Sequence, residues 1–161
     1  MSMRAVVGAA AVVVVWGVLA VSVWPLPSVG GASTTCAPTR PDIQGPFYKP
    51  NAPVRDKVGT GHVLAGTVRS MAQCAPLPGA RIEFWLAGPT GQYEDAYRAT
   101  VLADEAGRYR FTSIFPTPYS GRPPHIHIRV TASRHQVLVT QYYPKTGQTG
   151  GQLDLVLRPQ R

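Results

Sequence analysis

The chain has 161 residues, enough for one domain, and carries 16 Lys and Arg against 8 Asp and Glu, a net charge of +8. The basic residues are scattered rather than clustered, and they do not alternate with aromatic residues. The sequence therefore predicts no nucleic-acid partner, and the charge indicates solubility with a mild attraction for anionic small molecules.

The first 33 residues have the layout of a targeting segment. Residues 5–24 are uncharged and almost wholly apolar, a short basic start precedes them, and small residues follow. This order is typical of a cleaved secretory signal, although roughly 20 apolar residues can also span a bilayer as a retained anchor. Both alternatives predict that the rest of the chain is exported, either secreted or anchored to the membrane by residues 5–24.

The two cysteines, Cys36 and Cys74, both lie in the part predicted to be exported. An oxidising compartment favours their pairing as a disulfide. Such a bridge would join the start of the exported domain to a later loop.

Residues 34–60 are rich in Pro, Gly, Ser and Thr, which predicts an extended arm rather than regular structure. Phe47 and Tyr48 interrupt this composition with large aromatic side chains. We therefore expect residues 45–60 to pack on the domain that follows.

Residues 61–161 read as a series of short strands separated by turns that contain Gly and Pro. One segment alternates clearly, placing Ile82, Phe84 and Leu86 on one face and Arg81, Glu83 and Trp85 on the other. The pattern predicts an all-β fold, an antiparallel β-sandwich of about seven strands with long Pro/Gly-rich loops. The predicted strands lie within 62–70, 80–88, 97–104, 107–114, 125–132, 136–143 and 152–158.

Two histidines in the fifth of these segments are candidate metal ligands. Residues two apart in a strand project from the same face, so His125 and His127 could reach one metal ion while Ile126 and Ile128 face the core. A His-x-His pair on a strand is more often surface decoration. Tyr93 and Tyr119 lie in loops, where the simplest role of an aromatic side chain is to cap the end of a sandwich.

Four blocks in order, "GARIEFWLAGPTGQY", "DEAGRYRFTSIFPTPY", "RPPHIHIRV" and "VTQYY", resemble the intradiol ring-cleavage dioxygenases, and most closely the protocatechuate 3,4-dioxygenase type. The resemblance begins near "GPFY" at 45–48. It implies a non-haem Fe(III) held by two tyrosinates and two histidines. By this resemblance Tyr93 and His125 are equatorial ligands, and Tyr119 and His127 are axial ligands.

The resemblance also implies roles for other residues. Tyr119 would be the ligand released when the substrate binds, and it would then accept a proton. Arg122 would stabilise charge on the substrate, and Gln141 would lie in the pocket. Tyr48 could approach the substrate from the arm.

The activity implied is cleavage of a catechol-type ring between its two hydroxyl-bearing carbons, using O2 and giving a cis,cis-muconate-type diacid. Phenolate ligands favour iron(III) over iron(II), in agreement with such a site. Three other classes remain open. They are a transthyretin-like or carboxypeptidase-regulatory-like binding module, a metal protein without turnover, and a zinc hydrolase, although no carboxylate lies beside the histidine pair. The sequence predicts neither the natural catechol nor the oligomeric state.

Overall fold

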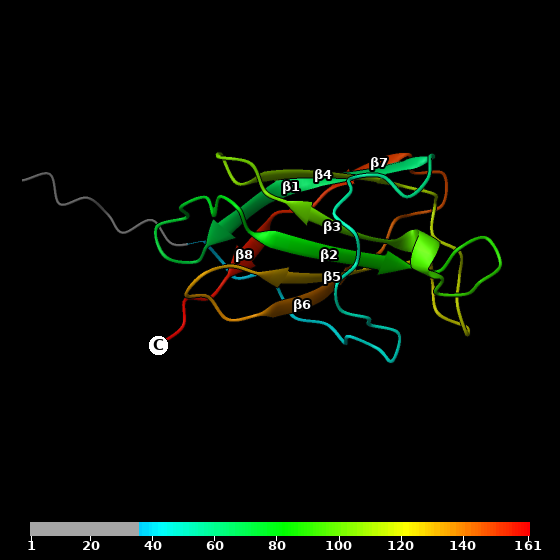
Figure 1. Ribbon diagram of the computed structural model, residues 1–161, viewed down its shortest axis with the longest axis horizontal. Helices are drawn as coiled ribbons and strands as arrows, with labels where there is room; N and C mark the ends of the chain where they lie inside the picture. The colour runs from blue at the N-terminus through cyan, green and yellow to red at the C-terminus, as the bar shows by residue number, and fades with distance from the viewer. Residues whose placement is uncertain (1–35) are drawn as a thin grey trace, which may run out of the picture. The chain divides into compact units, whose positions relative to one another are not determined.

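A computed structural model describes residues 36–161, which hold eight strands and one short 3-10 helix (Figure 1). The strands are β1 (His62–Ser70), β2 (Arg81–Leu86), β3 (Arg98–Leu102), β4 (Arg108–Ser113), β5 (Ile126–Thr131), β6 (Leu138–Tyr142), β7 (Gly150–Gln152) and β8 (Leu155–Leu157), and the 3-10 helix is η1 (Asp95–Tyr97). The predicted signal or anchor segment lies outside the described residues. Within 36–161, no helix is long and apolar enough to cross a membrane.

The prediction of an all-β sandwich is confirmed, because the strands form two four-stranded sheets. One sheet has the order β3-β2-β5-β6, and all of its pairs are antiparallel. In the other, β1 pairs antiparallel with β4. The other edge of β1 pairs first with β7 and then, further along, with β8. Both of these strands run parallel to β1. The antiparallel expectation therefore holds for every pair of strands within residues 36–161 except those two.

The last predicted strand is divided into β7 and β8 where the chain passes close to β1. A side chain at Gly66 of β1 would overlap the backbone carbonyl of Leu153, so only glycine permits this close approach. The Tyr109 hydroxyl donates to that carbonyl at 2.7 Å, and the Thr67 backbone N–H donates to the Asp154 carboxylate at 2.9 Å. These bonds replace ladder bonds where the strand is interrupted.

The core lies between the two sheets and follows the predicted alternation. The inward face of β2 is fully buried and consists of Ile82, Phe84 and Leu86. Phe84 stacks on Phe111 of β4 with ring centroids 4.2 Å apart, which joins the two sheets at the centre. Ile126 and Ile128 of β5 also belong to this core, as predicted. The opposite face of β2 and β5 is therefore free to carry polar side chains.

The arm crosses that opposite face (Figure 1). At one edge, the backbone N–H of Asp42 donates to the carbonyl of Val139 in β6 at 2.9 Å. At the other edge, the N–H of Arg55 donates to the carbonyl of Thr100 in β3 at 3.0 Å. The arm thus spans the whole β3-β2-β5-β6 sheet, with residues 43–54 lying between the two anchoring points.

The beginning of the arm is tied to the loop between β1 and β2. Cys36 and Cys74 form a disulfide, with their Cα atoms 5.2 Å apart. Thirty-eight positions separate them in the sequence, so the bridge closes a long loop that contains the entire arm and β1.

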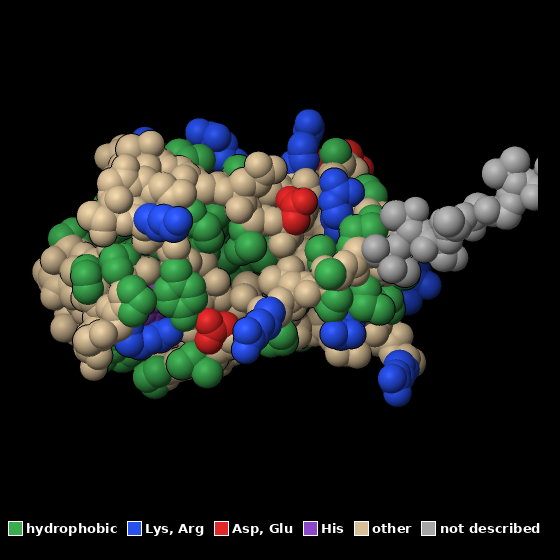
Figure 2. All heavy atoms as spheres, turned by 180° about the vertical axis from the view of Figure 1, so that it is seen from behind, with side chains coloured by type: hydrophobic (Ala, Val, Ile, Leu, Met, Phe, Trp, Pro, Cys, Tyr) green, Lys and Arg blue, Asp and Glu red, His purple; other side chains and the backbone are tan. Residues whose placement is uncertain are grey.

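Basic side chains are spread over the described surface. On the face shown in Figure 2, Lys and Arg form separate groups with neutral and hydrophobic side chains between them. This arrangement matches the scattered positions of these residues in the sequence.

Candidate metal centre and active site

The histidine pair projects from the outer face of the β3-β2-β5-β6 sheet, beneath the arm. His127 lies in β5 and His125 directly before it, and both are almost completely buried. Trp85 of β2 is the register partner of His127, and its indole stacks on the imidazole with centroids 4.9 Å apart and planes 5° from parallel. The indole therefore fixes the plane of the His127 ring.

Tyr93 meets both histidines. Its hydroxyl oxygen lies 2.8 Å from Nε2 of His125 and 3.2 Å from Nε2 of His127. The loop between β2 and β3 supplies Tyr93, and the buried Arg98 holds that loop by donating to the Tyr93 carbonyl at 3.0 Å. Arg55 of the arm in turn donates to the Arg98 carbonyl at 2.7 Å. The predicted ligands Tyr93, His125 and His127 thus converge on one point.

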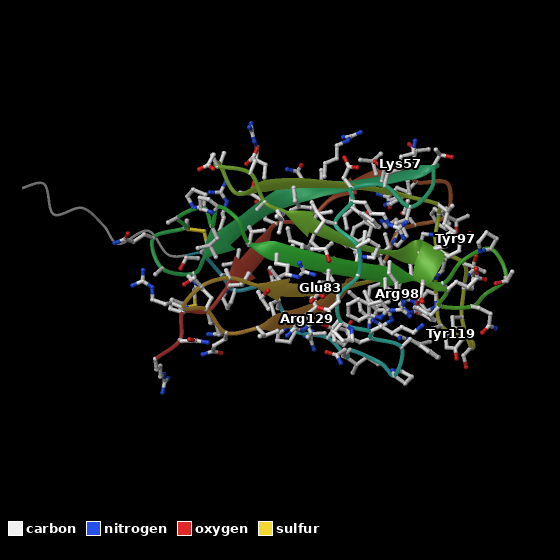
Figure 3. The ribbon with its side chains drawn as sticks, viewed as in Figure 1. Lys57, Glu83, Tyr97, Arg98, Tyr119 and Arg129 are labelled. Carbon is white, nitrogen blue, oxygen red and sulfur yellow. A yellow bond between two sulfur atoms is a disulfide. The ribbon has the colours of Figure 1, made fainter. Side chains whose placement is uncertain are left out.

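A tight turn brings Tyr119 beside the same group. Ser120 and Gly121 have φ values of 48° and 74°, and the N–H of Arg122 donates to the carbonyl of Tyr119 at 2.8 Å. Two central residues with positive φ are the pattern of a two-residue hairpin turn. The Tyr119 ring lies 5.3 Å from the Tyr93 ring, edge to face. Figure 3 shows Tyr119 at the same end of the sandwich as Arg98.

The turn also directs Arg122 toward the histidines. Its Nη1 lies 3.4 Å from Nε2 of His125, and its Nη2 donates to Oε1 of Gln141 at 2.7 Å. Gln141 is the register partner of His127 in β6, which explains why its amide lies beside the site. The structure therefore brings Arg122 and Gln141 together with the predicted metal ligands.

A cavity of about 210 Å³ opens onto these groups. Its walls come from the arm and from the predicted site, and they are Ile43, Gly45, Pro46, Phe47, Tyr93, Tyr119, Ser120, Arg122 and His127. Phe47 stacks on the Tyr93 ring at 4.6 Å and meets the Tyr119 ring edge to face at 5.2 Å. A larger cavity, of about 450 Å³, borders Asp42 and Gln141 but touches none of the four predicted ligands.

Ile43, Gly45, Pro46 and Phe47 were not identified as site residues from the sequence. The signal that could have found them is the "GPFY" block, with which the family resemblance begins. Tyr48 was expected near the substrate, but it is not among the cavity-lining residues. Its hydroxyl donates to Glu83 at 3.1 Å, and its ring packs on Trp85 at 5.2 Å.

Burial sets the protonation of the site before any metal binds. It lowers the pKa of His127 from the usual 6.5 to about 3, with His125 and Arg122 acting in the same direction. The pKa of His125 is also lowered, chiefly by burial. Burial raises the pKa of Tyr93 to about 12. At neutral pH both imidazoles are therefore neutral, and Tyr93 keeps its proton until a metal displaces it.

The donor set fits a ferric ion. Nδ1 of His125 lies 2.7 Å from the carbonyl of Pro123, so Nδ1 carries the proton and Nε2 presents a lone pair toward Tyr93. Residues 36–161 contain no group of three or more His, Cys, Asp and Glu side chains that could hold a metal. A metal at the histidine pair would find the Tyr93 oxygen beside both Nε2 atoms, and a phenol oxygen is a hard anionic ligand once deprotonated.

A family model described as "Dioxygenase" matches residues 43–123, about half of the chain. The match includes the arm, Tyr93, Tyr119 and Arg122, and it ends before His125.

Two curated relatives align at similar identity. A chlorocatechol 1,2-dioxygenase of Pseudomonas sp. strain P51 is 31% identical, over 68% of this chain and 57% of that protein. The intradiol ring-cleavage dioxygenase prcA of Aspergillus niger is 30% identical, over 67% and 46%.

Two solved dioxygenase structures superpose on this chain. The dioxygenase domain of a dioxygenase–carbohydrate-binding fusion protein from Streptomyces sp. SirexAA-E superposes with a TM-score of 0.69 at 27% identity, covering 76% of this chain and 99% of that one. Chlorocatechol 1,2-dioxygenase from Pseudomonas putida superposes with a TM-score of 0.64 at 27% identity, covering 73% and 71%. The chain spans about half the length of the curated relatives it matches.

Proposed function

We propose that the chain, which belongs to the intradiol ring-cleavage dioxygenase family, is itself an oxidoreductase that opens a catechol-type ring between its two hydroxyl-bearing carbons with O2. The product would be a cis,cis-muconate-type diacid. The observation that carries the proposal is the convergence of the Tyr93 hydroxyl on Nε2 of both His125 and His127, at the wall of a cavity that Tyr119 also lines.

Tyr93, Tyr119, His125 and His127 would hold a non-haem Fe(III), which when bound supplies Lewis acidity and a template for the catecholate. The two imidazoles are suited to bind at neutral pH because burial lowers their pKa values. Each tyrosine must release a proton when it binds the iron, so iron binding is favoured as the pH rises.

Tyr119 is the better candidate for the proton acceptor. The Tyr93 ring is stacked under Phe47, its hydroxyl is bonded to both histidines, and its carbonyl is held by Arg98. The Tyr119 hydroxyl makes no hydrogen bond within residues 36–161, and its backbone belongs only to the short turn. The Tyr119 ring packs edge to face on Phe47 and Tyr93, but a hydroxyl without a hydrogen-bond partner in the described residues is free to move and to take a proton from a catechol hydroxyl.

Arg122 supports charge that develops on the substrate. Arg122 lines the cavity, its Nη1 lies 3.4 Å from Nε2 of His125, and its guanidinium carries a positive charge. The arm forms one wall of the cavity, through Ile43, Gly45, Pro46 and Phe47, and so reduces the access of water to the reacting groups.

The substrate subclass is part of the proposal. The sequence blocks resemble the protocatechuate type most closely, whereas the relatives described above include chlorocatechol 1,2-dioxygenases. The short segments around Tyr93, Tyr119 and Arg122 favour an open pocket that takes substituted or larger catechols. A turnover panel of catechol, protocatechuate, chlorocatechols and bulkier catechols tests this, and refusal of all bulky members contradicts the open-pocket idea.

Export to an oxidising compartment also belongs to the proposal. It is supported by the uncharged apolar segment at residues 5–24 and by the Cys36–Cys74 disulfide. Secretion and retention as a membrane anchor are both consistent with that segment.

The test is to purify the protein, measure its iron, record its visible spectrum and follow oxygen uptake with catechol. Tyrosinate bound to ferric iron absorbs strongly in the visible range. We expect a coloured protein whose absorption is lost or strongly shifted in Tyr93→Phe and Tyr119→Phe but retained in Tyr97→Phe, a tyrosine outside the cavity lining. A protein that stays colourless and inert after addition of ferrous iron and air contradicts the proposal.

A further inference from the structure

A tyrosine and an aspartate that the proposed reaction does not use hold the guanidinium of Arg122. Tyr143 directly follows β6, and Asp42 lies in the arm 101 positions earlier. The Tyr143 hydroxyl oxygen lies 3.0 Å from Nη2 of Arg122 and 2.9 Å from Oδ2 of Asp42. We propose that Asp42 and Tyr143 are positioning residues that orient Arg122 toward the substrate. This inference rests on the function proposed above.

The orientation of the Gln141 side-chain amide determines how the first proton of Arg122 Nη2 is bound. Nε2 of Gln141 donates to the carbonyl of Ile43 at 2.6 Å. A carbonyl oxygen only accepts, so the amide nitrogen faces the arm and the amide oxygen faces Arg122. Oε1 of Gln141 therefore accepts one proton of Arg122 Nη2, at 2.7 Å.

The direction of the single Tyr143 hydroxyl proton determines how the second proton of Arg122 Nη2 is bound. Two acceptors lie 2.9 Å from this oxygen, namely Oδ2 of Asp42 and Oε1 of Gln141. A carboxylate is the stronger acceptor, and the Gln141 oxygen is already engaged by Arg122, so the proton points at Asp42. The lone pairs of the Tyr143 oxygen are then turned toward Arg122 and accept the second proton of Nη2.

Asp42 can impose this direction because it is itself held in place. Its Oδ1 accepts from the N–H of Ile43 at 2.7 Å, and its own N–H is bonded to Val139 of β6. Both protons of Arg122 Nη2 are thus used, and Nη1 is left facing the site beside His125. The chain Asp42–Tyr143–Arg122 links the position of the arm to the orientation of the guanidinium.

The test compares Tyr143→Phe, Asp42→Asn and the double variant with the wild type. Tyr143→Phe keeps the ring and removes the acceptor, so we expect kcat to fall about tenfold, with KM for catechol within about twofold. Asp42→Asn keeps the shape and removes the charged acceptor, and its effect should be smaller. The double variant should be no slower than Tyr143→Phe, because the two residues act through one contact.

Tyr142→Phe is the matched control, since that neighbouring tyrosine contacts His62 rather than the site, and we expect wild-type kcat. The iron absorption band and the unfolding temperature should be unchanged in Tyr143→Phe, which separates positioning from a loss of fold or metal. Crystal structures of the metal-free variants provide a readout that does not depend on turnover, and Arg122 should be displaced or split between conformers. An Arg122 that stays in place, or an unchanged kcat in active enzyme, overturns the inference. A wild type that consumes no oxygen counts against the proposed function alone, because the crystal structures still decide the position of Arg122.

Discussion

At the scale of single residues, Gly45 allows the arm to lie directly over the histidine pair. Its φ is +70°, and a Cβ at this position would lie 3.3 Å from Cε1 and 3.9 Å from Nε2 of His127. A side chain here would thus be strained in the backbone and pressed against a predicted metal ligand. No other arm glycine in the described chain has a Cβ position within 4 Å of a histidine.

Gly45→Ala should therefore harm both stability and metal loading. The positive φ alone costs about 1 kcal/mol of unfolding free energy, and the crowded imidazole should lower the iron content of the protein. Gly79→Ala is the matched control, because its φ is +67°, no atom lies within 4 Å of the added Cβ, and the loop between β1 and β2 carries no proposed metal ligand. Denaturant unfolding and iron analysis give the two quantities. Equal iron content in both variants would show that His127 is not crowded by the alanine.

At the scale of elements, a hydrogen bond from Tyr48 to the buried Glu83 secures the middle of the arm to the outer face of β2 and β5. Glu83, only 4% exposed, accepts from Arg129 Nη1 at 2.8 Å and from the Tyr48 hydroxyl at 3.1 Å. The Tyr48 ring packs on Trp85, which stacks on His127. The side chain once expected to touch the substrate thus connects the arm to the back of the histidine pair.

Tyr48→Phe should loosen the arm without unfolding the sandwich. The ring packing remains and Glu83 keeps Arg129, so one hydrogen bond to a charged group is lost, a cost of about 1–2 kcal/mol. Glu83→Gln should cost more, since it leaves the charge of Arg129, whose side chain is only 25% exposed, without its anionic partner. Amide hydrogen exchange along residues 43–54 measures the effect, with Tyr97→Phe as control. Exchange in this segment that matches the wild type would show that the arm is held elsewhere.

Local pattern predicted the strands and their faces because both depend on alternation within a few residues. One example is β2, which turns Ile82 and Phe84 toward the core and Trp85 toward the opposite face, and another is the common face of His125 and His127. The parallel pairing of β7 and β8 could not be predicted, since it depends on where a distant chain meets β1. The arm was predicted as an element, but its path depends on contacts such as Tyr48 with Glu83, 35 positions apart.

In the candidate site too, the sequence predicted some of the residues, whereas others could be found only from tertiary contacts. Alternation predicted the common face of His125 and His127, whereas Tyr93 and Tyr119 lie in loops and were identified through the family resemblance. The cavity wall formed by Ile43, Gly45 and Phe47 comes from a segment without any periodic pattern. Arg122 was identified with its partner Gln141, but Asp42 and Tyr143 were not, because their role follows from the direction of one hydroxyl proton.

At the scale of the whole described chain, the arm joins the site to the disulfide. Four of the cavity-lining residues belong to the arm, whereas the four proposed metal ligands all follow Cys74 in the sequence. The loop that the disulfide closes thus contains the cavity cover but none of the ligands. Loss of the disulfide should therefore affect the stability of the protein and the position of the arm over the cavity more than it affects metal binding.

The double variant Cys36→Ser, Cys74→Ser tests this separation. Opening a loop of 38 positions should lower the free energy of unfolding by about 2–4 kcal/mol, through the greater freedom of the unfolded chain. The iron content should stay close to that of the wild type, because Asp42 and Tyr48 still hold the arm near the site. Denaturant unfolding and iron analysis measure both, and a reductant should weaken the wild type but not the variant. A variant that loses its iron while remaining folded would mean that the disulfide, rather than these side chains, keeps the arm over the metal centre.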